Sequence, residues 1–91
     1  MNNYWYFIEA DEDKSCWWRL EFPDGIDCEA VQANCLCVWP EIYENGVCKF
    51  SYGATSEYDG YYEFEYLGSR KTLVEAKEAA ESLLAQFPKL V

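Results

Sequence analysis

The sequence predicts an α+β fold: an antiparallel sheet of four to five strands with one C-terminal helix packed on one face. Its first 67 residues contain short segments rich in aromatic and β-branched residues, separated by turn-forming residues, as is typical of antiparallel strands. After Gly68, apolar residues recur instead at helical spacing. Because 51% of the 91 residues are hydrophobic, residues 1–91 are expected to form a single domain with one core. The sheet face opposite the helix is expected to be open to water.

Residues 4–10 and 16–22 are predicted to form an N-terminal hairpin, because both segments are β-prone and a polar run separates them. Successive side chains of a strand point to opposite faces. The set that starts at Trp18 is the more apolar one and is expected to face the core. The same alternation directs Trp17 outward, where its ring is available to a partner.

A second predicted hairpin occupies the middle of the chain. Residues 35–39 are apolar and β-prone, and Pro40 interrupts them. The pair Asn45-Gly46 favours a tight turn, so residues 47–52 are predicted to be the return strand.

The next stretch is predicted to be a loop over 53–60 followed by a strand over 61–67. The strand alternates cleanly, with aromatic residues at even positions and Tyr61, Glu63 and Glu65 at odd ones. The odd positions are expected to face solvent and to present carboxylates there.

The helix is predicted from its start and stop signals. Thr72 and Glu75 have the spacing of a capping box, and Pro88 ends the helix. The shorter segment 26–34 is compatible with either a short helix or an irregular connection. The apolar residues of the C-terminal segment that recur at helical spacing are Leu73, Ala76, Ala80, Leu83, Leu84 and Phe87.

The charge of the chain is unevenly placed. Of its 17 acidic residues, 14 precede Tyr66, whereas the remainder of the chain is slightly basic. A net charge of −10 on so short a chain opposes compaction and projects a negative potential, which favours basic partners. Direct binding of nucleic acid is disfavoured for the same reason.

Catalytic and metal sites find little support in the sequence. Histidine, the commonest general base and metal ligand, does not occur. The acidic run at 11–13 lacks the glycine and terminal glutamate of a calcium loop. The chain is therefore predicted to be non-enzymatic, with no metal and no cofactor. The alternative is a zinc or redox protein built on four thiols, although only one close pair occurs among Cys28, Cys35, Cys37 and Cys48.

The predicted interaction surface combines carboxylates with aromatic anchors. Alternating carboxylates weaken a strand unless a partner compensates their repulsion. The expected partner is a basic nucleic-acid-binding protein or complex. The candidate contact residues are Asp11, Glu12, Asp13, Trp17, Glu57, Tyr58, Asp59, Tyr61, Glu63 and Glu65.

Two resemblances point the same way. Residues 6–13 (YFIEADED) and 17–24 (WWRLEFPD) resemble the first hairpin of HicB-like antitoxin domains, and 72–76 (TLVEA) resembles their helix. In size, acidity and composition the chain is similar to phage anti-CRISPR and related anti-defence proteins, and this likeness favours a CRISPR effector as the partner. Both resemblances imply a small acidic domain that covers a basic surface and excludes nucleic acid.

The expected location is the cytosol, that of the host cell if the chain is phage-encoded. The N-terminal residues show neither the basic region nor the apolar run of a signal peptide. An odd number of cysteines, five, fits reduced thiols better than a disulfide framework.

Overall fold

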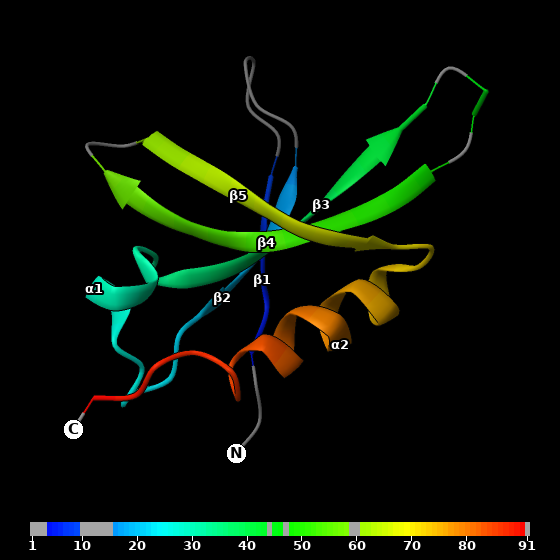
Figure 1. The fold of residues 1–91 in the computed structure, drawn as a ribbon. Helices are drawn as coiled ribbons and strands as arrows, with labels where there is room; N and C mark the ends of the chain where they lie inside the picture. Colours follow the sequence, from blue (N-terminus) through cyan, green and yellow to red (C-terminus); the bar gives the residue numbers. More distant parts are fainter. Residues whose placement is uncertain (1–3, 10–15, 44, 47, 59–60, 91) are drawn as a thin grey trace.

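A computed structural model describes residues 4–9, 16–43, 45–46, 48–58 and 61–90; for 57–58 and 61–64 it describes the backbone. In chain order the elements are β1 (Tyr6–Ile8), β2 (Trp17–Glu21), α1 (Cys28–Val31), β3 (Cys35–Ile42), β4 (Cys48–Tyr58), β5 (Tyr61–Arg70) and α2 (Leu73–Leu83) (Figure 1). The strands form one antiparallel sheet in the order β1-β2-β3-β4-β5. The α+β class, with a five-stranded antiparallel sheet and a C-terminal helix, is confirmed.

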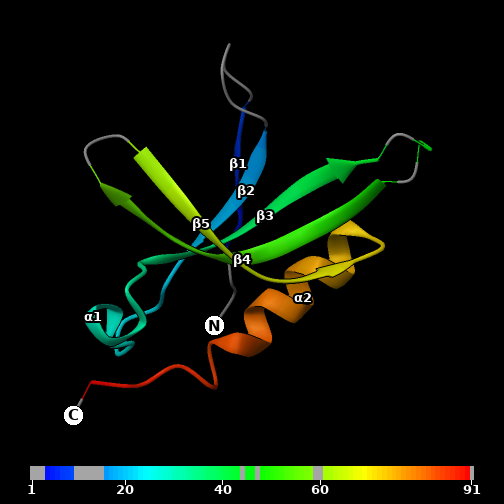
Figure 2. The same cartoon turned by 45° about the horizontal axis from the view of Figure 1, so that its top comes forward.

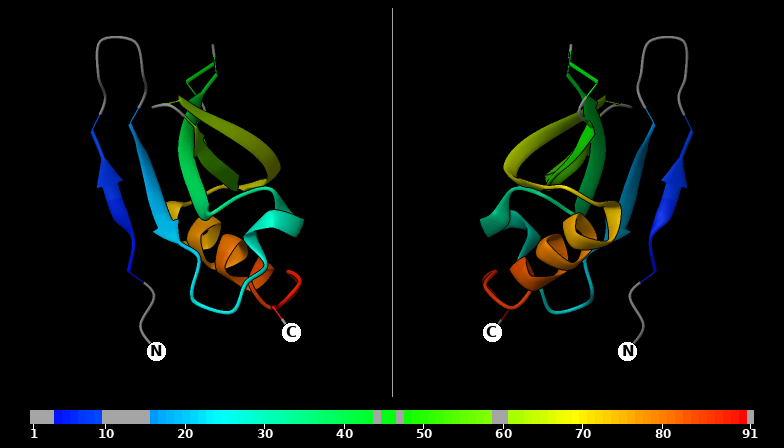
Figure 3. Two further views of the ribbon diagram at one scale, coloured as in Figure 1. Left: turned by 90° about the vertical axis from the view of Figure 1, so that its left-hand side faces the viewer. Right: turned by 90° about the vertical axis from the view of Figure 1, so that its right-hand side faces the viewer.

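One face of the sheet, here called the helix face, forms the apolar core with α2. It carries Leu20, Leu36, Val38 and Tyr52, which the register aligns across β2, β3 and β4. These side chains cluster with two small residues of α2, Ala76 and Ala80, that are completely buried. Small residues let the helix lie close to the sheet, and Figure 3 shows α2 running beneath the strands.

The ends of α2 are set by the predicted signals. The Thr72 hydroxyl accepts the Glu75 N–H at 3.2 Å and donates to the Glu75 carboxylate at 2.9 Å. Thr72 is therefore the N-cap, as the capping-box spacing predicts. The helix ends at Leu83, and a turn leads to Phe87, whose ring packs 5.3 Å from that of Phe22.

The hairpin between β3 and β4 explains how Pro40 fits inside a strand. Gly46 has a φ of +81°, and its N–H donates to the Tyr43 carbonyl at 2.8 Å, so Gly46 is the last residue of this turn. The β3–β4 ladder ends at Ile42 and Cys48, so the connection is longer than the tight turn predicted from Asn45-Gly46. Pro40 does not end β3, contrary to expectation, and pairs with Phe50 of β4. Among the described residues, the ladder from β2 reaches only Val38, and Pro40 pairs with β4 alone, so its missing N–H is tolerated.

The predicted loop at 53–60 is wrong over residues 53–58, which continue β4. Gly53 allows this, because the register shifts between Tyr52 and Gly53, and a Cβ at Gly53 would stand 1.8 Å from the Glu65 carbonyl oxygen. In Figures 1 and 2, β4 is bent along its length so that both of its ends turn away from α2. With this bulge and bend, residues 53–58 stay paired with β5, although their composition predicts a loop.

The segment at 26–34, left open by the sequence, contains the four-residue helix α1. Asp27 is its N-cap and accepts the Ala30 N–H at 3.1 Å. The C-terminal tail fixes this region, since the Asp27 N–H donates to Pro88 and the Leu90 N–H to Gly25. None of the helices among the described residues has the length and apolar character needed to cross a bilayer.

Candidate functional site

The structure describes few of the side chains predicted to contact a partner. Residues 11–13 and Asp59 lie outside the described residues, and at 57–58, 61 and 63 only the backbone is described. The β4–β5 hairpin pairs Ser56 with Glu63 and Ala54 with Glu65. Glu65 is exposed. Figure 1 places α2 toward the opposite end of β5, which leaves this part of the strand uncovered by the helix.

The prediction that Trp17 is an exposed anchor is wrong. Its side chain is only 4% exposed, on the face of the sheet opposite α2. We call this the cysteine face because it carries Cys35 and Cys37. The prediction that it is open to water is also wrong, because both thiols, Ser51 and Thr55 are buried there as completely as the helix-face core. Trp17 follows the strand alternation as predicted, but that alternation leads into a second buried layer.

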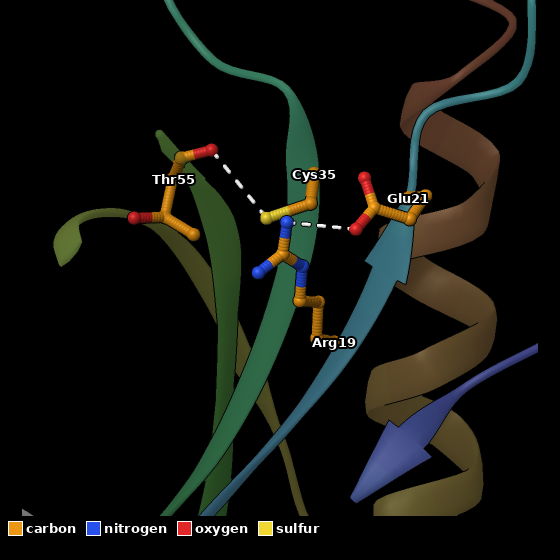
Figure 4. Close-up of polar contacts among 4 residues, drawn as sticks. All are labelled: Arg19, Glu21, Cys35 and Thr55. Atoms are coloured by element: carbon orange, nitrogen blue, oxygen red, sulfur yellow. Dashed lines mark hydrogen bonds and ion pairs between the residues drawn. The ribbon is translucent and has the colours of Figure 1, made fainter. Parts of the chain in front are cut away.

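Several buried polar groups on the cysteine face have partners within the sheet. The Arg19 guanidinium pairs with Glu21 at 2.7 Å, and the Arg19 side chain is only 15% exposed. Figure 4 shows it directed from β2 toward β3, near Cys35, whose thiol donates to the Thr55 carbonyl at 3.6 Å. Such pairing offsets the cost of removing these groups from water.

The cysteines do not converge on a metal site. Cys35 and Cys37 share the cysteine face, whereas Cys48 pairs with Ile42 on the other face, near the end of the hairpin. Cys28 begins α1 and is exposed. Within the part of the chain that the structure describes, no three cysteine or acidic side chains gather as metal ligands would. The geometry therefore gives no support to the zinc alternative.

Cys37 is also poorly suited to nucleophilic chemistry. Burial raises the pKa of its thiol well above the ordinary value of 9.0, and the neighbouring Cys35 raises it further. The nucleophilic form of cysteine is the thiolate, which this site disfavours. A redox or catalytic role for the buried thiols is accordingly not supported.

A cluster that sequence reasoning missed surrounds Glu41 on the cysteine face. Its carboxylate accepts the buried Ser51 hydroxyl at 2.8 Å, the Trp39 indole N–H at 3.4 Å and the Tyr43 hydroxyl at 3.4 Å. Lys49 is the cross-strand partner of Glu41, and its ammonium lies 5.6 Å from the centre of the Tyr43 ring. Glu41 is thus oriented by three donors from two strands and their connecting turn.

Tyr43 of this cluster and Tyr66 of β5 are both exposed. Tyr43 is 45% exposed and Tyr66 of β5 is 59% exposed. The pKa of Tyr43 is raised from 10.0, first by desolvation, then by the charge and hydrogen bond of Glu41 and by Tyr66. The sequence held a signal for part of this cluster, because Trp39, Glu41 and Tyr43 are spaced two apart on one strand face.

A second pair of tryptophan and glutamate lies beside α2. The Trp5 indole N–H donates to Glu81 at 2.6 Å. The Lys77 ammonium lies 5.8 Å from the ring centres of both Trp5 and Trp18. This pair has the same chemistry as Trp39 and Glu41, but it joins the N-terminal segment to the helix.

The basic side chains are mostly held by the protein itself. Of the six that the structure describes, Arg19 pairs with Glu21, Lys89 donates to the Leu84 carbonyl, and Lys49 and Lys77 lie over aromatic rings. Arg70 lies 5.3 Å above the Tyr52 ring, and Lys71 is exposed. Exposed carboxylates that form no ion pair with a described residue are Glu9, Asp24, Glu29, Glu65, Glu75 and Glu78.

The chain matches no protein-family model, no curated protein and no solved structure.

Proposed function

We propose that this protein is a non-enzymatic inhibitor that binds the basic surface of a nucleic-acid-handling protein or complex and blocks nucleic-acid binding. In this proposal it acts as a phage anti-CRISPR protein whose target is a CRISPR effector. The HicB-like resemblance implies the same physical act with a toxin as the target.

The observation that carries the proposal is the contrast between acidic and basic side chains. Five of the six described basic groups are engaged by a carboxylate, a carbonyl or an aromatic ring of the same chain. Most exposed carboxylates among the described residues form no ion pair with a basic side chain of the described part of the chain. The negative field of the net charge of −10 is therefore left largely uncompensated by cations on the same surface.

This charge distribution supports exclusion of nucleic acid by competition. Lysine and arginine side chains that neutralise phosphates would instead face carboxylates, and both ligands compete for the same groups. Long-range attraction raises the association rate and weakens as salt screens it. Binding is accordingly expected to be fast at low salt and strongly salt-dependent.

Affinity capture from a host lysate, followed by a competition assay, tests the proposal. The expected partner is a basic nucleic-acid-binding protein, and the purified inhibitor should displace a fluorescent oligonucleotide from it at stoichiometric amounts. A captured partner that binds the inhibitor and the oligonucleotide together would contradict the proposal, as would a partner without nucleic-acid affinity.

Two charge-matched variants separate a local surface from the overall field. One replaces Glu57, Asp59, Glu63 and Glu65 by their amides, and the other does the same to Asp24, Glu29, Glu75 and Glu78. Both lose four negative charges. If the β4–β5 hairpin is a contact surface, surface plasmon resonance over a salt series should show a larger loss of affinity for the first. Equal losses would show that this hairpin contributes only to the general field.

A further inference from the structure

We propose that the Glu41 cluster is the anchor site for an arginine side chain of the basic partner. The inference rests on the proposed function and adds to it a specific contact. The guanidinium would bind the Glu41 carboxylate while its plane packs against the exposed ring of Tyr43.

The first support is the hydrogen bonding of Glu41. A carboxylate offers about four acceptor positions, and three donors occupy part of this capacity. Two of these bonds are long, at 3.4 Å, and only the Ser51 bond is short, at 2.8 Å. The carboxylate is thus held in one orientation and still able to accept a strong charged donor.

The second support is a cation already present beside the cluster. The Lys49 ammonium lies over the Tyr43 ring but forms no ion pair with Glu41, its cross-strand neighbour. Its position shows that the ring face attracts a positive group, as expected of an aromatic face. Because Lys49 is exposed, its ammonium can move away from the Tyr43 ring. A cation of the partner can then contact both this ring and the Glu41 carboxylate.

The third support is the exposure of the aromatic rim. Tyr43 leaves about half of its surface in water, unlike Trp17 on the same sheet face. Tyrosine and arginine are enriched among residues that dominate binding energy. Arginine is favoured over lysine because its planar group stacks on rings and is more weakly hydrated.

A nuclear magnetic resonance titration of the intact 15N-labelled protein tests the site. The probe is a blocked peptide of alternating glycine and arginine, compared with the same peptide containing lysine. The Trp39 indole N–H donates to Glu41 and therefore reports on the site, while the Trp5 indole on Glu81 is the internal control. The arginine peptide should shift the Trp39 signal much more than the Trp5 signal, and should bind at least about threefold more tightly than the lysine peptide.

Matched variants distinguish the anchor from general charge attraction. Glu41→Gln should weaken binding of the arginine peptide about fivefold, and Glu81→Gln, with the same change of charge, less than twofold. Lys49→Met should strengthen binding by removing the competing cation, beyond the effect of Lys71→Met, which removes the same charge from an exposed site. Tyr43→Leu keeps the carboxylate and should weaken binding through loss of the ring.

Specific outcomes would overturn the proposal. Equal effects of Glu41→Gln and Glu81→Gln, or a Trp39 signal that does not move while the peptide binds, would show that charge attraction alone operates. Equal affinity for the two peptides would contradict the choice of arginine. A failure of the proposed function gives a different result. The protein would then not displace the oligonucleotide from its natural partner, even if the arginine peptide binds at Glu41.

Discussion

The two faces of the sheet use the same strands but are buried in different ways. On the helix face, Leu36, Val38 and Tyr52 pack against Ala76 and Ala80, as in an ordinary apolar core. On the cysteine face, the same strands bury thiols and hydroxyls, whereas α2 packs on the opposite face. A sheet face whose sequence is partly polar is therefore not always exposed. Short polar side chains can be buried when their hydrogen bonds are satisfied.

The two faces also differ in role: the helix face forms the core, and the edge of the cysteine face is available to a partner. α2 covers the helix face, where the core lies. On the cysteine face, Glu41 instead accepts hydrogen bonds from the buried Ser51 and from the half-exposed Tyr43. A partner can therefore contact the oriented Glu41 carboxylate and the Tyr43 ring at this edge of the cysteine face without disturbing the core.

Among the proposed substitutions, Gly53→Ala should cause the largest loss in the free energy of unfolding. The new Cβ would stand 1.8 Å from the Glu65 carbonyl oxygen, a backbone atom that can move only if the β4–β5 ladder shifts. We expect a loss of about 4 kcal/mol or more, a large part of the stability of a domain this small. Chemical denaturation measures it.

Gly68→Ala is the matched control on the helix face. Its Cβ would meet the end of the Tyr52 side chain at 2.5 Å, and this ring can tilt to relieve the contact. A smaller loss than that of Gly53→Ala is expected. Equal losses would contradict the special role given to the bulge.

A pair of truncations compares the two buried layers directly. Leu36→Ala and Cys37→Ala change neighbouring residues of β3 that are both completely buried but face opposite sides. Leu36→Ala should cost about 3 kcal/mol through lost apolar burial and a cavity. Cys37→Ala removes a single sulfur and should cost about 1 kcal/mol. A larger loss for Cys37→Ala in urea denaturation would mean that the cysteine face, and not the helix face, dominates stability.

The last effect should appear only at alkaline pH. The pKa of Cys37 is raised by burial, so the folded protein retains a proton that the unfolded chain loses above the ordinary pKa of 9.0. The unfolded state then binds fewer protons, and the free energy of unfolding falls as pH rises, by up to about 1.4 kcal/mol per pH unit from this thiol. The raised pKa of Tyr43 acts in the same direction. Denaturation between pH 8 and about 10 should show a weaker decline for Cys37→Ala. An unchanged decline would contradict the raised pKa.

Local signals predicted the elements whose structure depends on nearby residues. Thr72 and Glu75 indicated the start of α2, and Asn45-Gly46 indicated the place of the β3–β4 turn, although the connection is longer than predicted. The predicted loop failed at Gly53, because the pairing that keeps this residue in β4 comes from strands distant in sequence. Alternation indicated correctly on which side of β2 Trp17 lies, but it cannot report that the second side is also covered.

The Glu41 cluster was only partly accessible to sequence reasoning. The spacing of Trp39, Glu41 and Tyr43 places them on one face of a strand. Ser51 joins them through the β3–β4 register, which pairs it with Trp39.

Site-specific photocrosslinking to the captured partner tests most directly the claim that the cysteine-face edge makes the contact. A photoreactive phenylalanine analogue would replace Tyr43 beside Glu41 or, as the matched control, Phe7, which is similarly exposed at 53% but pairs with Trp18 of the helix face. The account predicts a strong crosslink from position 43, abolished by competing oligonucleotide, and little from position 7. A crosslink from position 7 with none from position 43 would contradict it.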